Sequence, residues 1–408
     1  MIKKITIHQL RPGIFVHDFN CSVATHNLIM EPALIKDDKI IGILNSWGIK
    51  EVYIDTDKGL DVAKAQPKQE INRQTDNALQ KLAKAQPKSQ RSAILREEIT
   101  LAKNIKSRAI SVLENVMHQV KKGAPLETKE SYQLIDQMNQ SISRNKDALV
   151  LLTRIRKKDE YTMMHSISVG AYILNFCSSN KISHDRTMAL AIGALFHDIG
   201  KTKIPLAILN KPGKLTEDEF AEMKRHSLYS AEVLKHSKGL PDEAHDMALH
   251  HHERYDGTGY PDGLKGDEIS YGSQLCALAD VYDALTSDRC YKNGIDRIEG
   301  LRKLYEWSEN HFNKELTYEF IRSIGVYPIG TCVKLESGRI GVVVGSTEES
   351  EKPVVRIFHD TVKGVALPVH DVDLFYTEDK VAMYEDPEKW DIKKMNIFAD
   401  ITEDLFPV

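Results

Sequence analysis

Three kinds of hydrophobic pattern divide the chain. Residues 1–60 combine one helical stretch, in which Ile40, Ile41 and Leu44 share a face, with short strand-like runs such as Val52-Tyr53-Ile54. From residue 128 to residue 323 the apolar spacing stays helical. After Gly325 the runs become short, and a Ser337-Gly338 turn separates two of them. The pattern predicts a mainly α protein: a helical bundle with a small α/β N-terminal module and a small antiparallel β appendage at the C-terminus.

Residues 61–127 show a weaker pattern between the module and the bundle. Residues 61–92 are rich in Gln, Lys and Ala and contain the same hexapeptide twice, at 63–68 and 83–88, which favours a linker. One amphipathic helix is expected over residues 94–122 and another from Thr128 past Ile142. These two helices could form a homodimer interface or pack within the domain. The predicted units are 1–60, 61–127, 128–323 and 324–408, the last ending in an acidic tail with no assigned role.

Composition narrows the function classes. The chain has 408 residues, 41% of them hydrophobic, and no apolar run near the ~20 residues that span a membrane. No signal peptide is expected, and the odd, scattered cysteines predict free thiols in a reducing, cytoplasmic compartment. A net charge of -4 argues against wrapping a long nucleic acid, although a local group of cations can still bind a small anion.

Histidines gather in one part of the chain. Nine of the sixteen lie between residues 165 and 252, around the run His197-Asp198-Ile199-Gly200-Lys201. Residues 189–196 are apolar and predict a buried helix that carries the His-Asp pair inward, with Gly200 ending the helical pattern. Alone, this pair could equally be a metal site or a structural pair, and one histidine of the run 250–252 is expected to be a bystander. A bundle could point seven side chains inward: His165, His197, Asp198, His226, His251, His252 and Asp280.

Five imidazoles and two carboxylates exceed the ligand set of one tetrahedral zinc ion. Two ions ~3.5–4 Å apart can hold a hydroxide between them and clamp the attacking and leaving oxygens of a phosphoryl displacement. The ligand types suit iron, manganese, nickel or zinc and do not choose among them. Our expectation is iron or manganese. The sequence therefore favours two divalent metal ions.

The segment after the His251-His252 pair reads Glu253-Arg254-Tyr255-Asp256-Gly257-Thr258-Gly259-Tyr260-Pro261-Asp262-Gly263, a glycine-rich tight loop. With it, residues 159–292 resemble the HD-GYP family of bacterial cyclic dinucleotide phosphodiesterases. The resemblance rests on Tyr161-Thr162-x-x-His165-Ser166, His197-Asp198-Ile199-Gly200-Lys201, Leu215-Thr216-x-x-Glu219, His226, His251-His252-Glu253, Gly259-Tyr260-Pro261, residues 279–286 and Arg289-x-Tyr291-Lys292. Through Leu10-Arg11-Pro12-Gly13 and Val52-Tyr53-Ile54-Asp55, residues 1–60 resemble a small module found ahead of some of these proteins.

The resemblance implies a role for each matching residue. His165, His197, Asp198 and Asp280 would bind one metal, and Asp198 would bridge to a second held by His226, His251 and His252. Lys201 would join Asp198 in catalysis by stabilising transition-state charge or the leaving oxygen, although a lysine at a helix C-terminus also fits the helix dipole. Residues assigned to the substrate side are Arg289 and Lys292, which would grip phosphate oxygens, Gly259 and Tyr260 at the mouth of the site, and Asp283, which would orient a ligand or Lys201.

One departure from the family pattern concerns a third metal. Some members have a glutamate four residues before the first histidine, where this chain has Tyr161. Glu160 is one residue off, a step that turns a helical side chain by about 100°. We therefore expect two metals, and the departure places cleavage past the linear dinucleotide to mononucleotides in doubt.

The implied function is hydrolysis of cyclic di-GMP to linear pGpG by a hydroxide bridging the two metals. Three alternatives remain open. The substrate could be 3′3′-cyclic GMP-AMP, since metal ligands do not discriminate bases. A nucleotidohydrolase acting on nucleoside triphosphates or alarmones is disfavoured by the Gly-Tyr-Pro loop and by Arg289 and Lys292. A non-catalytic sensor or scaffold, gripping cyclic dinucleotide synthase domains, is disfavoured because every expected ligand is present.

Overall fold

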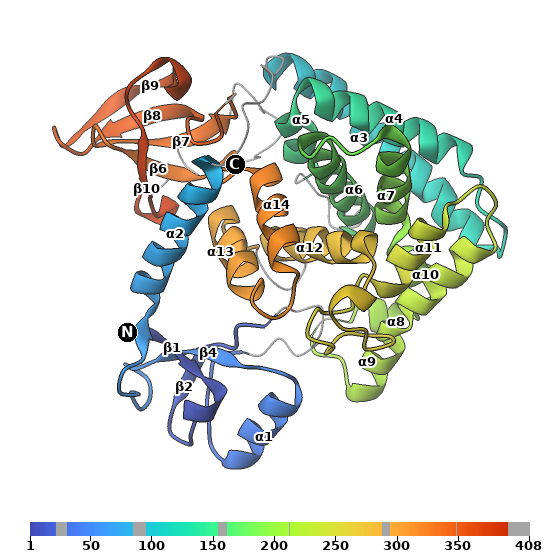
Figure 1. The fold of residues 1–408 in the computed structure, drawn as a ribbon, viewed down its shortest axis with the longest axis horizontal. Helices are drawn as coiled ribbons and strands as arrows, with labels where there is room; N and C mark the ends of the chain where they lie inside the picture. The colour runs from blue at the N-terminus through green and yellow to red at the C-terminus, as the bar shows by residue number, and fades with distance from the viewer. Residues whose placement is uncertain are drawn as a thin grey trace.

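The chain folds into an N-terminal α/β module, a helical bundle and a C-terminal sheet, which agrees with the expected fold class (Figure 1). The computed structural model describes residues 1–21, 31–84, 95–153, 161–211, 213–287, 294–347 and 349–390. None of the helices it describes is long and apolar enough to cross a membrane.

The N-terminal module is a five-stranded antiparallel sheet of order β3-β2-β4-β1-β5, with one helix. Helix α1 begins where the Asp37 side chain accepts a hydrogen bond from the Ile40 amide (3.1 Å), and it ends before Gly48, whose φ is +73°. The predicted helix and the predicted strand at residues 52–54 are confirmed. The elements are β1 (Ile2–Thr6), β2 (Phe15–Asp18), β3 (Ala33–Leu34), α1 (Asp38–Ser46), β4 (Glu51–Asp55) and β5 (Gln66–Pro67).

Helix α2 (Lys68–Lys84) occupies much of the segment predicted as a linker, and the structure corrects that prediction for these residues. Its buried positions are four apart: Ile71, Thr75, Leu79 and Ala83. This stripe is narrow, so the surrounding Lys and Gln conceal it in the composition. Leu79 and Ala83 join the main hydrophobic core, and α2 contacts α13 and α14, which explains why the helix is docked rather than free.

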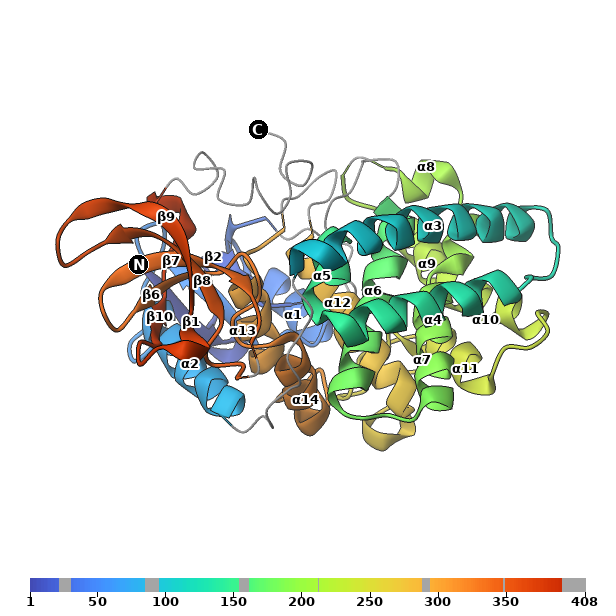
Figure 2. The same cartoon turned by 90° about the horizontal axis from the view of Figure 1, so that it is seen from above.

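The bundle is built around α6 and α12, whose residues are mostly buried. Of the two possibilities for the amphipathic helices, the structure shows packing within the chain: Ala102, Leu113 and Val116 of α3 share a core with α4 to α7 (Figure 2). The helices are α3 (Leu95–Lys121), α4 (Lys129–Arg144), α5 (Lys146–Leu152), α6 (Tyr161–Ser179), α7 (His184–Phe196), α8 (Leu206–Leu209), α9 (Glu217–Lys224), α10 (His226–Lys235), α11 (Asp242–His250), α12 (Tyr271–Thr286), α13 (Arg297–Trp307) and α14 (Lys314–Ile324).

The C-terminal sheet is antiparallel, with strand order β10-β6-β7-β8-β9. The predicted antiparallel β appendage is confirmed, and its last strand, β10, lies in the acidic tail. Its Tyr384 is buried and donates a hydrogen bond to the Val326 carbonyl (2.6 Å), which ties the tail to the end of the bundle. The strands are β6 (Cys332–Leu335), β7 (Arg339–Gly345), β8 (Val354–Asp360), β9 (Val365–Asp373) and β10 (Val381–Tyr384).

The N-terminal module docks on α13 and on the loop that follows α11. Tyr53 of β4 donates a hydrogen bond to Glu306 (2.8 Å), and Lys303 pairs with Asp18 (2.9 Å). A Cβ added at Gly48 would lie 3.2 Å from the Thr258 side chain, so the turn after α1 touches the Gly-Tyr-Pro loop. The module is therefore in direct contact with a loop adjoining the histidine-rich region.

Candidate metal centre

Three helix ends bring histidines to one place in the bundle. His197 and His251 directly follow the last residues of α7 and α11, and His226 begins α10 just after α9. The last carbonyls of a helix lack partners within it, and they carry partial negative charge. The C-terminal ends of α7 and α11 therefore favour a cation in this buried region, whereas the N-terminal end of α10 brings partial positive charge to it.

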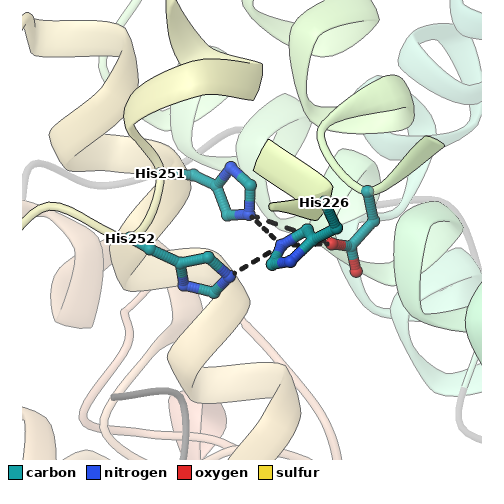
Figure 3. Close-up of side chains that lie close together, drawn as sticks. His226, His251 and His252 are labelled. Carbon is teal, nitrogen blue, oxygen red and sulfur yellow. Dashed lines mark hydrogen bonds and ion pairs between the residues drawn. The ribbon is translucent and has the colours of Figure 1, made fainter. Parts of the chain in front are cut away.

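The seven predicted residues, here called the His–Asp cluster, lie together in two groups. The ligand atoms of Asp198, His226, His251 and His252 lie within 4.8 Å of one another, as do those of His165, His197 and Asp280. Figure 3 shows His226, His251 and His252 pointing toward one another. The Nε2 atom of His226 is 3.4 Å from Nε2 of His251 and 3.0 Å from Nε2 of His252. Ligand atoms about 2.0–2.1 Å from one tetrahedral ion lie roughly 3.4 Å apart, so this spacing suits a shared ion.

Asp198 lies between the two groups. Its Oδ1 is 3.3 Å from His226 Nε2 and 3.8 Å from His251 Nε2. Its Oδ2 is 3.6 Å from His165 Nε2 and 3.4 Å from His197 Nε2. One carboxylate oxygen therefore faces each group.

Backbone carbonyls hold three of the imidazoles in one tautomer. The Nδ1 atoms of His197, His226 and His251 donate hydrogen bonds to carbonyls three residues earlier, at 2.7, 2.6 and 3.0 Å. Because a carbonyl can only accept, Nδ1 carries the proton and the Nε2 lone pair points to the cluster. The remaining ring nitrogen is thus prepared to bind a metal.

The pKa values in the cluster favour neutral His226 and His252, ionised carboxylates and a positive charge on His165. Burial, followed by the charge of Lys201, lowers the pKa of His226 to about 4, and burial lowers that of His252 to about 3. Burial alone would raise the pKa of Asp198, but Lys201 and His197 hold it well below its usual value. Burial likewise opposes charge on His165, yet hydrogen bonds to Asp280 and Asp283 raise its pKa to about 9. The two carboxylates attract positive charge to the His165 side of the cluster.

Two buried atoms of the cluster lack hydrogen-bond partners among the described residues, His197 Nε2 and Asp198 Oδ1. An unpartnered buried polar atom is costly, and it calls for a specific explanation. Both atoms have lone pairs that face the cluster, where a cation would satisfy them. The donor set and these two atoms fit divalent metal ions.

Lys201 and the Gly-Tyr-Pro loop complete the surroundings. Lys201 Nζ lies 2.5 Å from Asp198 Oδ2, and the lysine side chain is partly exposed. Lys201 and Gly200 both belong to a 3-10 turn over residues 199–203, so Gly200 does not end the local helical structure as predicted. A Cβ at Gly200 would lie 2.2 Å from the His226 carbonyl, so glycine permits this turn to approach α10. The Tyr260 ring packs on His252, with centroids 4.8 Å apart.

Two residues of the loop serve its shape. A Cβ at Gly259 would lie 2.4 Å from the Arg254 amide, so Gly259, predicted among the substrate contacts, allows close backbone packing here. Sequence reasoning assigned no role to Glu253. Its buried carboxylate accepts hydrogen bonds from the amides of Asp262 (2.7 Å) and Gly263 (3.0 Å), which fixes the loop beside His252. Its position directly after the histidine pair was the available signal.

The structure separates other predicted residues from the cluster. His250 is the bystander of its run, hydrogen-bonded to Asp246 (2.8 Å) and Asp262 (3.0 Å). Asp283, grouped with the substrate side in the sequence prediction, is buried behind His165, whose Nδ1 donates to it (2.7 Å); this contact agrees with the expectation that Asp283 orients a ligand. Arg289, Lys292, Glu160 and the side chain of Tyr161 lie outside the described residues.

Asp283→Ala is expected to weaken metal binding about 10–100-fold, because His165 loses the carboxylate that fixes its ring. Metal retained after dialysis against graded chelator measures the effect. Asp283→Asn keeps an acceptor oxygen and should recover a large part of the affinity. Parental affinity in Asp283→Ala would show that the contact does not orient a ligand.

Sequence comparisons identify two matching families and several similar proteins. A family described as HD domain matches residues 128–316, and a domain of unknown function (DUF3391) matches residues 2–131. A cyclic di-GMP phosphodiesterase of Pseudomonas aeruginosa is 35% identical over 400 residues, covering 97% of this chain and 95% of that protein.

Two further relatives match only part of the chain. A cyclic di-GMP phosphodiesterase response regulator of Xanthomonas campestris is 39% identical over 42% of this chain and 46% of its own length. A 3′3′-cGAMP-specific phosphodiesterase of Vibrio cholerae is 34% identical over 41% of this chain and 32% of its own length.

Proposed function

Since this chain belongs to the HD-GYP family of cyclic di-GMP phosphodiesterases, we propose that it hydrolyses cyclic di-GMP to linear pGpG. The observation that carries the proposal is the position of Asp198, with one carboxylate oxygen toward each group of the His–Asp cluster. A carboxylate in this position can bridge two metal ions.

In this proposal, Asp198 contributes to both ion sites. One ion is bound by His165, His197 and Asp280, and the other by His226, His251 and His252. When bound, the two ions lower the pKa of a water molecule and neutralise charge on phosphoryl oxygens. We propose that the ions are iron or manganese. Nickel and zinc are the alternatives, because mixed imidazole and carboxylate ligands suit all four metals.

Ring opening adds water across one phosphodiester. A new phosphorus–oxygen bond forms while the bond to a ribose 3′-oxygen breaks, and the leaving oxygen takes a proton. Lys201 is partly exposed beside Asp198, so its ammonium can donate to a phosphoryl oxygen or to the leaving oxygen as negative charge develops. Arg289 and Lys292 are proposed to bind phosphate oxygens, and Tyr260 to line the entrance.

The proposal extends to the surroundings of the enzyme. Cys177, Cys276 and Cys332 are free thiols, which supports a cytoplasmic location. Homodimer formation and contact with cyclic dinucleotide synthase domains remain proposals from the sequence.

Anaerobically purified protein, supplied with iron or manganese, is expected to convert cyclic di-GMP to pGpG and to stop there. Product identification by mass spectrometry and metal analysis of the same sample measure this. The similarity to a 3′3′-cGAMP-specific phosphodiesterase makes 3′3′-cyclic GMP-AMP the second candidate, so both substrates are assayed in parallel. Faster turnover of the mixed dinucleotide would favour that candidate, whereas tight binding without product would support a sensor.

A further inference from the structure

Lys224, the last residue of α9, lies between two aromatic rings near the His–Asp cluster. Its Nζ is 5.1 Å from the centroid of the Phe220 ring and 5.8 Å from that of Tyr260. Rings at such distances attract an ammonium group and hold it in place. Because Tyr260 also packs on His252, one aromatic ring separates Lys224 from a predicted metal ligand.

Lys224 has no carboxylate partner among the described residues, unlike four other cations of residues 201–225. Lys201 pairs with Asp198, Lys203 with Glu232, Lys211 with Glu219 and Arg225 with Glu222, at 2.5–2.9 Å. Lys224 is partly buried, and no described carboxylate neutralises its ammonium group. It is a positioned positive charge that is available to an anion.

We propose that Lys224 binds the second phosphodiester of the cyclic dinucleotide, the one that is not being hydrolysed. This inference rests on the proposed function. A cyclic dinucleotide has two phosphodiesters on opposite sides of one ring, so the second lies outside the metal centre when the first reaches it. A lysine ammonium binds phosphate as a point charge, and the aromatic rings limit where that charge can lie.

Contact between Lys224 and the second phosphodiester would distinguish substrates by the number of phosphodiesters that they carry. A substrate with a single phosphodiester can reach the metals without meeting Lys224. Cyclic di-GMP and 3′3′-cyclic GMP-AMP both carry the second phosphate and would both use the contact. Lys224 would therefore favour cyclic dinucleotides over simple phosphodiesters without discriminating between bases.

The test compares Lys224→Met with the parent on cyclic di-GMP and on bis(p-nitrophenyl) phosphate, a single phosphodiester. Methionine keeps an apolar chain between the rings and removes the charge. We expect KM for cyclic di-GMP to rise about tenfold with kcat nearly unchanged, as for loss of one hydrogen bond to a charged group, while turnover of the single phosphodiester stays at the parental level. Lys224→Arg should restore most of the KM.

Lys203→Met is the matched control, because its ammonium also lies over a ring (Tyr229, 5.6 Å) but is paired with Glu232. Its KM should stay parental. An unchanged KM in Lys224→Met, or an equal loss on both substrates, would overturn the inference while leaving the phosphodiesterase intact. If the parent protein turns over neither substrate, the proposed function itself fails.

Discussion

Asp198→Ala is expected to remove both metal binding and phosphodiesterase activity. Its carboxylate is the one group of the cluster that faces both halves, and each oxygen lies within 3.3–3.8 Å of imidazole nitrogens. Loss of the shared ligand leaves each group one donor short. Turnover should fall at least ~10³-fold, the scale seen when a central group of a catalytic unit is removed.

The substitution should also lower stability. Lys201 pairs with the buried Asp198, and removing one partner of a buried pair costs on the order of 3 kcal/mol. Asp198→Asn separates the two effects, because it keeps the side-chain volume while removing the negative charge. Metal per chain, turnover and thermal unfolding are measured on both variants. Glu232→Gln, which breaks the exposed Lys203 pair, is the control and should keep all three near parental values. Parental turnover in Asp198→Ala would refute the site assignment.

Lys201→Ala is expected to keep both metals and lower kcat about 10²–10³-fold, the usual effect of losing one donor to transition-state charge. The ammonium is the cation nearest Asp198 Oδ2 among the described residues, and it is partly exposed. Metal content and steady-state kinetics on the same preparation distinguish catalysis from support of the ligands. Lys203→Ala, two residues along the same turn, controls for general loss of positive charge. If the metals leave with Lys201, its function is to support the ligand set.

The sequence predicted the cluster well because its ligands lie in local patterns. His197-Asp198 and His251-His252 are adjacent pairs at helix ends, and residues that are adjacent in the sequence stay close together in the structure. The orientation of the rings could not be predicted, since it depends on carbonyls of Ala194, Met223 and Ala248 whose exposure follows from where each helix ends. The sequence left open whether Asp283 orients a ligand or Lys201, because its contact with His165 is set by the packing of α12 against α6.

Among the larger elements too, those with a local sequence pattern were predictable and those that depend on tertiary contacts were not. Long helices with wide apolar faces, such as α3 and α4, were recognisable from spacing. Helix α2 was not recognisable, because only one residue in four is buried and this narrow stripe is buried by its contact with α13 and α14. The docking of the N-terminal module depends on side-chain pairs such as Lys303 with Asp18, separated by 285 residues, which no local pattern reveals.

The main hydrophobic core passes without interruption from α2 through α6, α12 and α14 into the C-terminal sheet. Leu79, Phe320 and Val355 belong to the same cluster. The domain boundary expected at residue 324 therefore falls inside a single packed unit. The sheet and the bundle should melt as a single cooperative block, and a chain shortened after α14 would expose part of the shared core, to which Phe320 and Ile321 belong. The strands at the C-terminus are thus part of the folding unit that carries the metal centre.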